Sequence, residues 1–372
     1  MRVKFNQLEK QWHLIKDDVL KDFETLFETS NYILGNKVTE FENAFAEFCQ
    51  TDYSIGVATG TDALKLAAAA ITNEGESVCI YLPINTFVAT YIGIKDALPN
   101  ANFVFIDFDK FYQIDVNDLE EQVNMHYLRY DKHIIVPVHL YGYTSNMLAI
   151  KNIAEKYNCN IIEDSSQAHG AVSNVGVVGS SSSVSCFSLY PGKNLGAAGD
   201  AGIITTNNKE IRDKILDLRN YGSTIKYVHN TFGYNSRLDT IQAIVLLHKL
   251  NHLNQWNENR RLSINRMVEG IDNELITLPK TPEYCVEPVH HIFPVRVTNK
   301  ENFISYLNSN NIDNSIHYPT LLTDLPFIKQ SREFSNSRNI VNELVSLPVH
   351  PFMSNEDENK IIEVLNNYEN II

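Results

Sequence analysis

A lysine in a glycine-rich loop is the first feature of this sequence that could carry out chemistry. Lys193 lies in SLYPGKNLGAAGDAG (188–202), directly after a predicted strand and among four glycines. Glycines let the backbone turn tightly and approach a bound group closely. A lysine held there, partly removed from water, can have an amine pKa low enough to attack a carbonyl carbon. A lysine in a mobile surface loop is the alternative. A P-loop is excluded, because Asn194 follows the lysine where serine or threonine is required.

A carboxylate ends a predicted buried strand in IIEDSSQAHG (161–170). The carboxyl ends of strands are where α/β sheets bind ligands. A pyridinium cofactor needs a carboxylate at its ring nitrogen, to keep the nitrogen protonated and the ring an electron sink, and Asp164 is in position for this. Glu163 points to the opposite side of an alternating strand, so the two carboxylates should have different roles. The alternative is that Asp164 caps a following helix.

A third candidate is ATGTDALKLAAAA (58–70), where Gly60 leads into a predicted helix at Thr61. The first turn of a helix offers free backbone N–H groups and the positive end of the helix dipole, which suit a phosphate. An ordinary capped helix is the alternative, because Thr59, Thr61 or Asp62 could each cap it.

The elements that must position these residues follow from an alternation of apolar and amphipathic runs. Continuous apolar strands that alternate with helices predict a mostly parallel sheet covered on both faces, an α/β fold. The seven predicted strands are 54–59, 77–83, 102–108, 133–140, 159–165, 184–190 and 201–206, and the last two should pair around the loop of Lys193. The predicted helices are 8–30, 38–49, 61–71, Thr86–Asp96 and 146–158.

From about residue 209 the pattern becomes helical, with runs at 209–222 and 240–271. The second run is long enough to link two domains. A strand at 290–297 and helices at 300–311 and 355–368 follow, which indicates a smaller α+β domain. We therefore expect a large domain with an N-terminal helix over residues 1–250, and a linker helix with a small C-terminal domain over residues 251–372.

Composition limits the classes of function. The net charge of −14 disfavours nucleic acid as a partner, because an acidic surface repels phosphate backbones. The five cysteines show no CxxC pair, so neither a disulfide framework nor a metal site is expected. No signal peptide or membrane-spanning run is apparent, so we expect a cytoplasmic protein without a membrane partner.

Together these motifs resemble the DegT/DnrJ/EryC1/StrS family of sugar aminotransferases, which have the aspartate-aminotransferase fold (fold type I). The resemblance spans nearly the whole chain. It is carried by YILGNKVTEFENAFAEFC, GVATGTDAL, LPINTFVAT, VPVHLYG, IIEDSSQAHGA, FSLYPGKNLGAAGDAG, RNYGS, GYNSRLDTIQA, IHYP and SLPVHPFMS. It implies a large domain with a mostly parallel, seven-stranded mixed sheet, and pyridoxal 5′-phosphate as the cofactor, with pyridoxamine 5′-phosphate in the cycle.

The resemblance also assigns roles to individual residues. Lys193 matches the lysine that holds the cofactor as a Schiff base, and Asp164 matches the carboxylate at the pyridine nitrogen. Asn235 matches a phosphate contact supplied by the neighbouring subunit, which implies a homodimer with shared sites. The other matches are Gln167 for the 3′-oxygen side of the cofactor, Gly60, Thr61 and Ser188 for the phosphate, and Phe87 for the ring that stacks on the pyridine. A core phenylalanine is the alternative for Phe87.

The implied reaction is ping-pong. L-glutamate gives its amino group and leaves as 2-oxoglutarate, and a keto-sugar nucleotide then accepts the amine. YPGKNLG, RNYGS and IHYP resemble the branch that acts on C3 of a dTDP-linked 3-keto-6-deoxyhexose, for the biosynthesis of surface polysaccharide or glycan. The candidates for substrate contacts are Tyr190, His317, Tyr318 and Tyr221, and those for the diphosphate are Lys226, Arg219 and Arg237.

Several alternatives remain open at this stage. The same lysine chemistry would serve an aminotransferase that acts at C4 of the sugar or on an inosose. A protein that binds the cofactor or a sugar nucleotide without turnover is the alternative from another class, although Lys193, Asp164 and Gln167 together favour an enzyme. A histidine in place of Lys193, typical of dehydratases in the family, is absent. An NAD-dependent oxidoreductase is excluded, because no GxGxxG follows the first strand.

Overall fold

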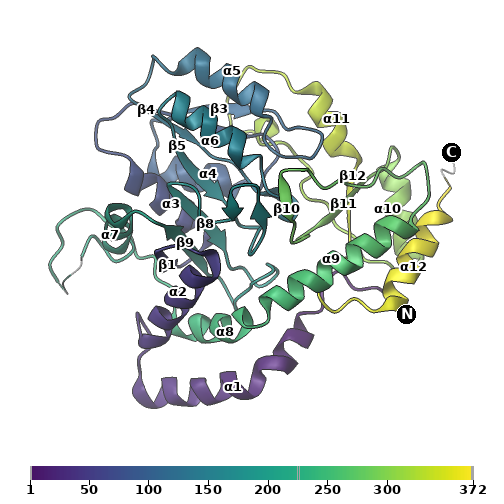
Figure 1. Cartoon of the computed structure of the whole chain (residues 1–372), viewed down its shortest axis with the longest axis horizontal. Helices are drawn as coiled ribbons and strands as arrows, with labels where there is room; N and C mark the ends of the chain where they lie inside the picture. The colour runs from purple at the N-terminus through teal and green to yellow at the C-terminus, as the bar shows by residue number, and fades with distance from the viewer. Residues whose placement is uncertain (1, 224, 226, 370–372) are drawn as a thin grey trace.

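The computed structural model describes residues 2–223, 225 and 227–369 and is built around a seven-stranded mixed sheet (Figure 1). The sheet order is β1-β9-β8-β5-β4-β2-β3, in which β1 and β9 run antiparallel to their neighbours and all other pairs are parallel. This confirms the predicted sheet. The strands are β1 (Tyr53–Val57), β2 (Val78–Pro83), β3 (Asn102–Ile106), β4 (Lys132–Ile135), β5 (Asn160–Asp164), β8 (Val184–Ser188) and β9 (Gly202–Thr206).

Helices cover both faces of the sheet because the strands are apolar on both sides. On β2, Ile80 and Leu82 face one buried cluster while Cys79 and Tyr81 face another, as strand alternation requires. The first face packs on α3 (Gly60–Ile71), α4 (Ala89–Ala97) and α7 (Lys209–Leu218). The second face packs on α2 (Asn36–Cys49), α5 (Val116–His126), α6 (Met147–Lys156) and α8 (Thr240–Leu250), and α1 (Leu8–Thr29) packs on α8.

The C-terminal segments form a separate buried cluster on one side of α9 (Leu253–Gly270). A two-stranded sheet of β11 (Phe293–Arg296) and β12 (Leu344–Leu347) lies against α10 (Lys300–Ser309) and α12 (Asn355–Asn366). α11 (Ser335–Glu343) precedes β12, and a small sheet joins β10 (Cys285–Glu287), β6 (Val172–Ser173) and β7 (Gly176–Val177). Two short 3₁₀ segments lie at Leu140–Gly142 and Leu322–Asp324. Within the described ranges, no helix has the length and apolar character needed to cross a membrane.

The first residues of the chain lie in this C-terminal part rather than beside α1. Val3 forms a parallel bridge with Ile312 and belongs to the C-terminal buried cluster. The ring of Phe5 stacks on the imidazole of His317 with centroids 5.9 Å apart. The segment before the first helix therefore contacts residues that lie about three hundred positions later in the sequence.

Three sequence-based boundaries were wrong, and two helices were missed. The helix expected at 240–271 is two helices, because the chain breaks at Asn251 and His252. α4 begins at Ala89 rather than Thr86, and residues 84–88 form a loop. The strand expected at 133–140 ends at Ile135, since Pro137 cannot donate a ladder hydrogen bond. The helices α5 and α11 were not predicted, although Asp115 caps α5 through hydrogen bonds from Asn117 N and Asp118 N.

Candidate active site

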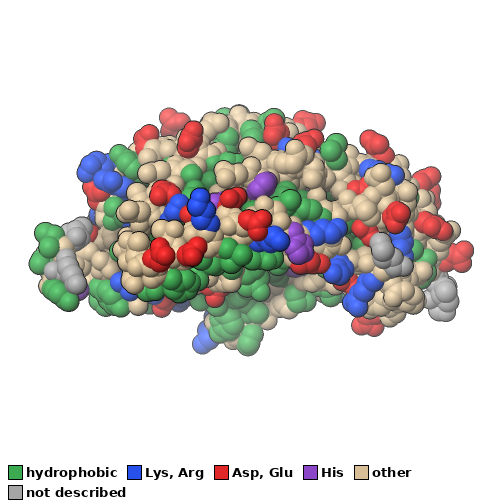
Figure 2. Space-filling view, turned by 90° about the horizontal axis from the view of Figure 1, so that it is seen from below, with side chains coloured by type: hydrophobic (Ala, Val, Ile, Leu, Met, Phe, Trp, Pro, Cys, Tyr) green, Lys and Arg blue, Asp and Glu red, His purple; other side chains and the backbone are tan. Residues whose placement is uncertain are grey.

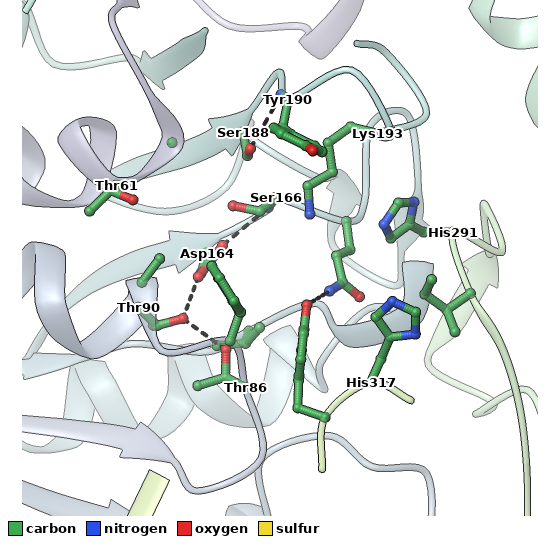
Figure 3. Close-up of a pocket in the computed structure, with 18 of the residues that line it drawn as sticks. Thr61, Thr86, Thr90, Asp164, Ser166, Ser188, Tyr190, Lys193, His291 and His317 are labelled. Carbon is green, nitrogen blue, oxygen red and sulfur yellow. Dashed lines mark hydrogen bonds between the residues drawn. The ribbon is translucent and has the colours of Figure 1, made fainter. Parts of the chain in front are cut away.

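A cavity of about 640 Å³ opens at the carboxyl ends of β5 and β8 and is closed on its far side by C-terminal segments. Figure 3 shows Lys193 and Asp164 on opposite sides of it, with Thr61 and Ser188 toward one end and His291 and His317 toward the other. Most predicted cofactor residues line this one cavity, together with three of the predicted substrate contacts. These are Gly60, Thr61, Phe87, Asp164, Gln167, Ser188, Tyr190, Lys193, His317 and Tyr318.

The loop that carries Lys193 is tied at several points. Lys193 N donates to Tyr190 O (2.9 Å), and Asn194 Nδ2 donates to Asn257 Oδ1 (3.0 Å) and Val289 O (2.9 Å). Lys249 Nζ donates to Gly196 O at 2.7 Å. A Cβ at Gly196 would lie 2.3 Å from Pro191 O, so only glycine allows this path. The loop is therefore a rigid turn between β8 and β9, and the surface-loop alternative does not apply.

The Lys193 side chain opens onto the cavity but is otherwise enclosed by protein. This burial lowers the pKa of the Lys193 amine from 10.5 to about 8, and the charge of Asp164 opposes the shift only in part. A neutral amine is the nucleophilic form of a lysine, so the site holds a reactive amine at a pH where an exposed lysine would be almost fully protonated.

Asp164 is held by two hydrogen bonds at the end of β5. Thr90 Oγ1 donates to Asp164 Oδ2 (2.7 Å), Ser166 N donates to Asp164 Oδ1 (3.2 Å), and Thr86 and Thr90 join their hydroxyls at 2.7 Å. Glu163 lies on the other face of the strand, where its Oε2 accepts from His139 Nε2 at 2.7 Å. The expected separation of the two carboxylates is confirmed, and only Asp164 reaches the cavity.

The N-terminus of α3 forms a compact end of the cavity. Thr59 caps the helix by accepting a hydrogen bond from Asp62 N (2.9 Å). Gly60 lies so close to Ser188 that a Cβ there would be 2.6 Å from Ser188 Cβ. Gly60, Thr61 and Ser188 all line this end of the cavity, where the first turn of α3 supplies backbone N–H groups and Ser188 a hydroxyl. Such a set of donors at a helix N-terminus fits a phosphate group.

The opposite wall is built from polar and aromatic side chains that contact one another. Gln167 accepts a hydrogen bond from Tyr141 N at Oε1 (2.6 Å) and donates to Tyr318 Oη from Nε2 (2.9 Å). The rings of Phe87 and Tyr318 have centroids 5.3 Å apart. His317 Nδ1 is 2.9 Å from Ser346 Oγ, and burial, with the Lys193 charge adding to it, lowers the pKa of His317 to about 4. Phe87 is half exposed in the loop before α4, so it is not a core phenylalanine.

Some predicted residues do not line this cavity. Asn235 is exposed and bridges Asn220, and Tyr221 is exposed beneath the Arg237 guanidinium. Arg219 is buried in an ion pair with Glu42, 2.5 Å between Nη1 and Oε1, so it is not available for a diphosphate here. Lys226 lies outside the described residues. That Asn235 contacts the phosphate in a neighbouring subunit's site, and that Tyr221 contacts the substrate, stay predictions.

The structure adds four residues that the motifs did not single out. Thr90 and Ser166 orient Asp164, and His291 and Arg260 line the cavity at the end away from α3. Thr90 follows LPINTF at the first turn of α4, where a hydroxyl beside a strand end could have been noticed. No local pattern marks Arg260 or His291, because both reach the cavity only through the packing of α9 and β11.

The chain has a mostly parallel sheet, a buried amine that faces a carboxylate, and a site for a phosphate at a helix N-terminus. These features are typical of the fold type I class of lysine-dependent cofactor enzymes. The model of the DegT/DnrJ/EryC1/StrS aminotransferase family matches residues 13–366, and the chain belongs to this family. It is a sugar aminotransferase, in a family whose cofactor is pyridoxal phosphate.

Individual relatives agree with this family. The chain is 40% identical over 352 residues, 92% of this chain and 93% of the relative, to the dTDP-3-amino-3,6-dideoxy-alpha-D-galactopyranose transaminase of Aneurinibacillus thermoaerophilus. It is 32% identical over 360 residues, 94% of each chain, to the UDP-N-acetyl-3-dehydro-alpha-D-glucosamine 3-aminotransferase of Acidithiobacillus ferrooxidans. The structure of S. venezuelae DesV in complex with a ketimine intermediate aligns with a TM-score of 0.93 at 31% identity, covering 100% of this chain and 99% of that chain.

The lowered pKa of Lys193 predicts how its reactivity depends on pH. In cofactor-free protein, the rate of imine formation with added pyridoxal phosphate should rise with pH and level off above about 8, because the neutral amine is the nucleophile. The measurement is the absorbance change at a series of pH values, with Lys193→Met as the unreactive control. A rate that keeps rising to about pH 10.4, the value of an exposed lysine, would contradict it.

The hydrogen bond from Thr90 to Asp164 predicts that Thr90 supports catalysis by orienting this carboxylate, although no sequence motif assigned Thr90 a role. Thr90→Val keeps the shape but removes the donor, so we expect the catalytic rate constant to fall about 10- to 100-fold, since a hydrogen bond to a charged group contributes ~1.5–3 kcal/mol. Thr205→Val is the matched control, because Thr205 is a buried threonine that donates to Gly179 O outside the cavity. Equal effects of the two substitutions on the rate constant would refute this role.

Proposed function

We propose that the chain transfers an amino group from L-glutamate to C3 of a dTDP-linked 3-keto-6-deoxyhexose, with pyridoxal phosphate bound in the cavity. The product would be a dTDP-3-amino-3,6-dideoxyhexose for surface polysaccharide or glycan. The observation that carries this proposal is the pairing of a buried, partly neutral Lys193 amine with Asp164 across one cavity.

The cofactor fits the residues that are present. The cradle at Gly60, Thr61 and Ser188 suits its phosphate, and Asp164, at the far side from Lys193, suits the ring nitrogen. Phe87 offers an aromatic face on the wall of the cavity, and Gln167 retains one amide N–H beyond the bond to Tyr318. These residues supply groups of the kinds that the phosphate, the ring nitrogen and the ring face of the cofactor require.

When bound, pyridoxal phosphate would supply a carbonyl group and an electron-withdrawing ring, and the chain would supply the rest. The carboxylate of Asp164, oriented by Thr90 and Ser166, would hold a proton at the ring nitrogen. The Nζ amine of Lys193, once free, would take the proton from the α-carbon of the amino donor. Its pKa of about 8 suits this role, because a base with a pKa near the working pH can both accept and return a proton.

The choice of substrate is supported by the relatives. The relative at 40% identity is named for a dTDP-3-amino-3,6-dideoxyhexose, and the relative from A. ferrooxidans is also named for amination at C3, on a UDP-sugar. Both names favour C3 as the acceptor carbon, and the higher identity favours dTDP. Tyr190, His317 and Tyr318 line the cavity at positions where they can contact the hexose.

The proposal includes a homodimer with shared sites. α1 and the turn after it expose a series of large apolar side chains, and Figure 2 shows hydrophobic side chains spread over the face seen from the α1 side of the molecule. The segment between α7 and α8, which carries Tyr221 and Asn235, extends away from the sheet, and Phe232 within it is 77% exposed (Figure 1). Such exposed apolar groups favour burial against a second copy. Those on α1 and its turn are Trp12, Leu14, Leu20, Phe27, Tyr32, Ile33 and Leu34.

An absorption spectrum tests the proposed reaction. We expect the band of the bound cofactor to shift when L-glutamate is added, and to return when a dTDP-3-keto-6-deoxyhexose is added, in its gluco or galacto form. Return with only a 4-keto sugar would establish the alternative acceptor carbon. Binding of cofactor without any response to amino donors would favour a non-catalytic binding protein.

Mixing two inactive variants tests the shared site. Lys193→Met removes the amine, and Asn235→Asp places a negative charge where the partner's phosphate contact is proposed. If each site uses Lys193 from one subunit and Asn235 from the other, a mixture refolded together should regain part of the wild-type activity, because a mixed dimer has one intact site. The control is each variant refolded alone. A monomer in sedimentation analysis, or no recovery in mixed dimers, would rule the arrangement out.

A further inference from the structure

Arg260 is a buried cation in the wall of the cavity. It lies on α9, is only 2% exposed and lines the same cavity as Lys193. Its Nη1 donates to two backbone carbonyls, Val349 O at 2.8 Å and His290 O at 3.3 Å. Its Nε is buried without a hydrogen-bond partner. Carbonyl oxygens hold the guanidinium in place, but they do not neutralise its charge.

The charge of Arg260 lacks a counter-ion from the chain. Among residues 2–223, 225 and 227–369, no carboxylate forms an ion pair with this guanidinium. Burial lowers the pKa of Arg260 to about 9, so the group is still charged at neutral pH. The other buried arginine, Arg219, pairs with Glu42. A buried charge is costly unless it is paired, which points to an anion supplied by a ligand.

The imidazoles around Arg260 neither balance its charge nor add to it. Burial lowers the pKa of His290, His291 and His350, and the charge of Arg260 lowers each of them further. These imidazoles therefore stay neutral near pH 7, and Arg260 is the cation of this end of the cavity. Arg260 is bonded to the segments that lead into β11 and out of β12, away from the phosphate cradle at α3.

The position of His291 relates Arg260 to the reacting amine. His291 lines the cavity, and the charges of both Lys193 and Arg260 contribute to its lowered pKa, so both cations lie within electrostatic reach of one imidazole. An amino-acid donor carries its amine and its α-carboxylate on the same carbon. A donor whose amine reacts beside Lys193 thus has its carboxylate within one bond of the reacting carbon, and a guanidinium is the group that best matches a carboxylate.

We propose that Arg260 binds the α-carboxylate of the amino donor. This rests on the proposed function, in which an amino acid and a keto-sugar nucleotide use the cavity in turn. The keto-sugar nucleotide carries a diphosphate but no α-carboxylate, so the proposal places Arg260 in the donor half-reaction, and a loss confined to the acceptor half-reaction would overturn it. Arg260 would then decide that the donor is an α-amino acid rather than a simple amine.

The two half-reactions, followed separately by absorbance in the cofactor-loaded enzyme, test this role. With Arg260→Lys, which keeps a positive charge but loses the planar fork, we expect kcat/KM for L-glutamate to fall about 10- to 100-fold. The half-reaction of the pyridoxamine-phosphate form with the keto-sugar nucleotide should change little. Arg261→Lys is the matched control, because the neighbouring Arg261 pairs with Glu258 and does not line the cavity. Equal loss in both half-reactions would show that Arg260 only braces α9, and would overturn the proposal.

A comparison of donors on the wild-type enzyme needs no substitution at Arg260. L-glutamate α-amide keeps the amine and the γ-carboxylate but loses the α-carboxylate charge. Its kcat/KM with the wild-type enzyme should therefore be as low as that of L-glutamate with the Arg260→Lys variant. Combining the amide with Arg260→Lys should cost little more, since both changes remove one interaction. Additive losses would overturn the proposal.

A binding measurement separates this inference from the proposed function. Glutarate, an unreactive dicarboxylate, should raise the thermal midpoint of the wild-type holoenzyme and should not raise that of Arg260→Lys. If glutarate binds in this way but L-glutamate never changes the spectrum, the proposed reaction fails while the carboxylate site stands. If glutarate stabilises both proteins equally, or neither, the carboxylate site fails whatever the spectrum shows.

Discussion

The site depends on keeping one lysine amine out of bulk water while leaving it reachable from a cavity. Burial of Lys193 disfavours its charged form, and this makes the amine reactive at moderate pH. Such burial is stable only if the loop cannot swing outward. Asn194 is therefore hydrogen-bonded to α9 and to the segment after β10. Gly196 O accepts a hydrogen bond from Lys249 of α8, whose side chain is buried.

The two carboxylates at the end of β5 also have separate roles. Adjacent carboxylates on one strand must face opposite sides of the sheet, so Asp164 serves the cavity while Glu163 serves the interior. Burial alone would raise the pKa of Glu163, but the hydrogen bond from His139 lowers it below its ordinary value. Ser145 N donates to His139 Nδ1, so His139 directs its Nε2 hydrogen to Glu163. The hydrogen bond between His139 and Glu163 thus fixes the end of β5 on the face opposite the cavity, and this holds the backbone of Asp164 in place.

Local patterns were sufficient for the sheet and for the centre of the site. Apolar runs and their spacing identified the seven strands, because burial on both faces leaves a strong signal. The glycines around Lys193 and the strand end at Asp164 marked two residues that the structure brings to one cavity, and their catalytic roles stay predictions. The assignment of cofactor roles to Gln167, Phe87 and Asn235, and the domain boundary at 250/251, came from resemblance or length and stay predictions.

What the sequence could not reveal depended on distant packing or on single backbone atoms. Arg260 looks like any arginine of an amphipathic helix, and its place in the cavity wall is seen only with its hydrogen bonds to His290 O and Val349 O, which lie far from it in the sequence. Arg219 looked available for a diphosphate until Glu42, 177 residues away, was seen to hold it. The break between α8 and α9 could not be predicted from the sequence, because it falls at Asn251 and His252, with no proline or glycine to mark it.

The bridge between Val3 and Ile312 has a consequence for how the protein is made. On the ribosome, Val3 is synthesised 309 residues (312 − 3) before the partner that pairs with it. At elongation speeds of roughly 5–20 residues per second, the segment that carries Val3 waits on the order of 15 to 60 s for this partner. Phe5 and Asn6 line the cavity, so its last wall closes only late in translation.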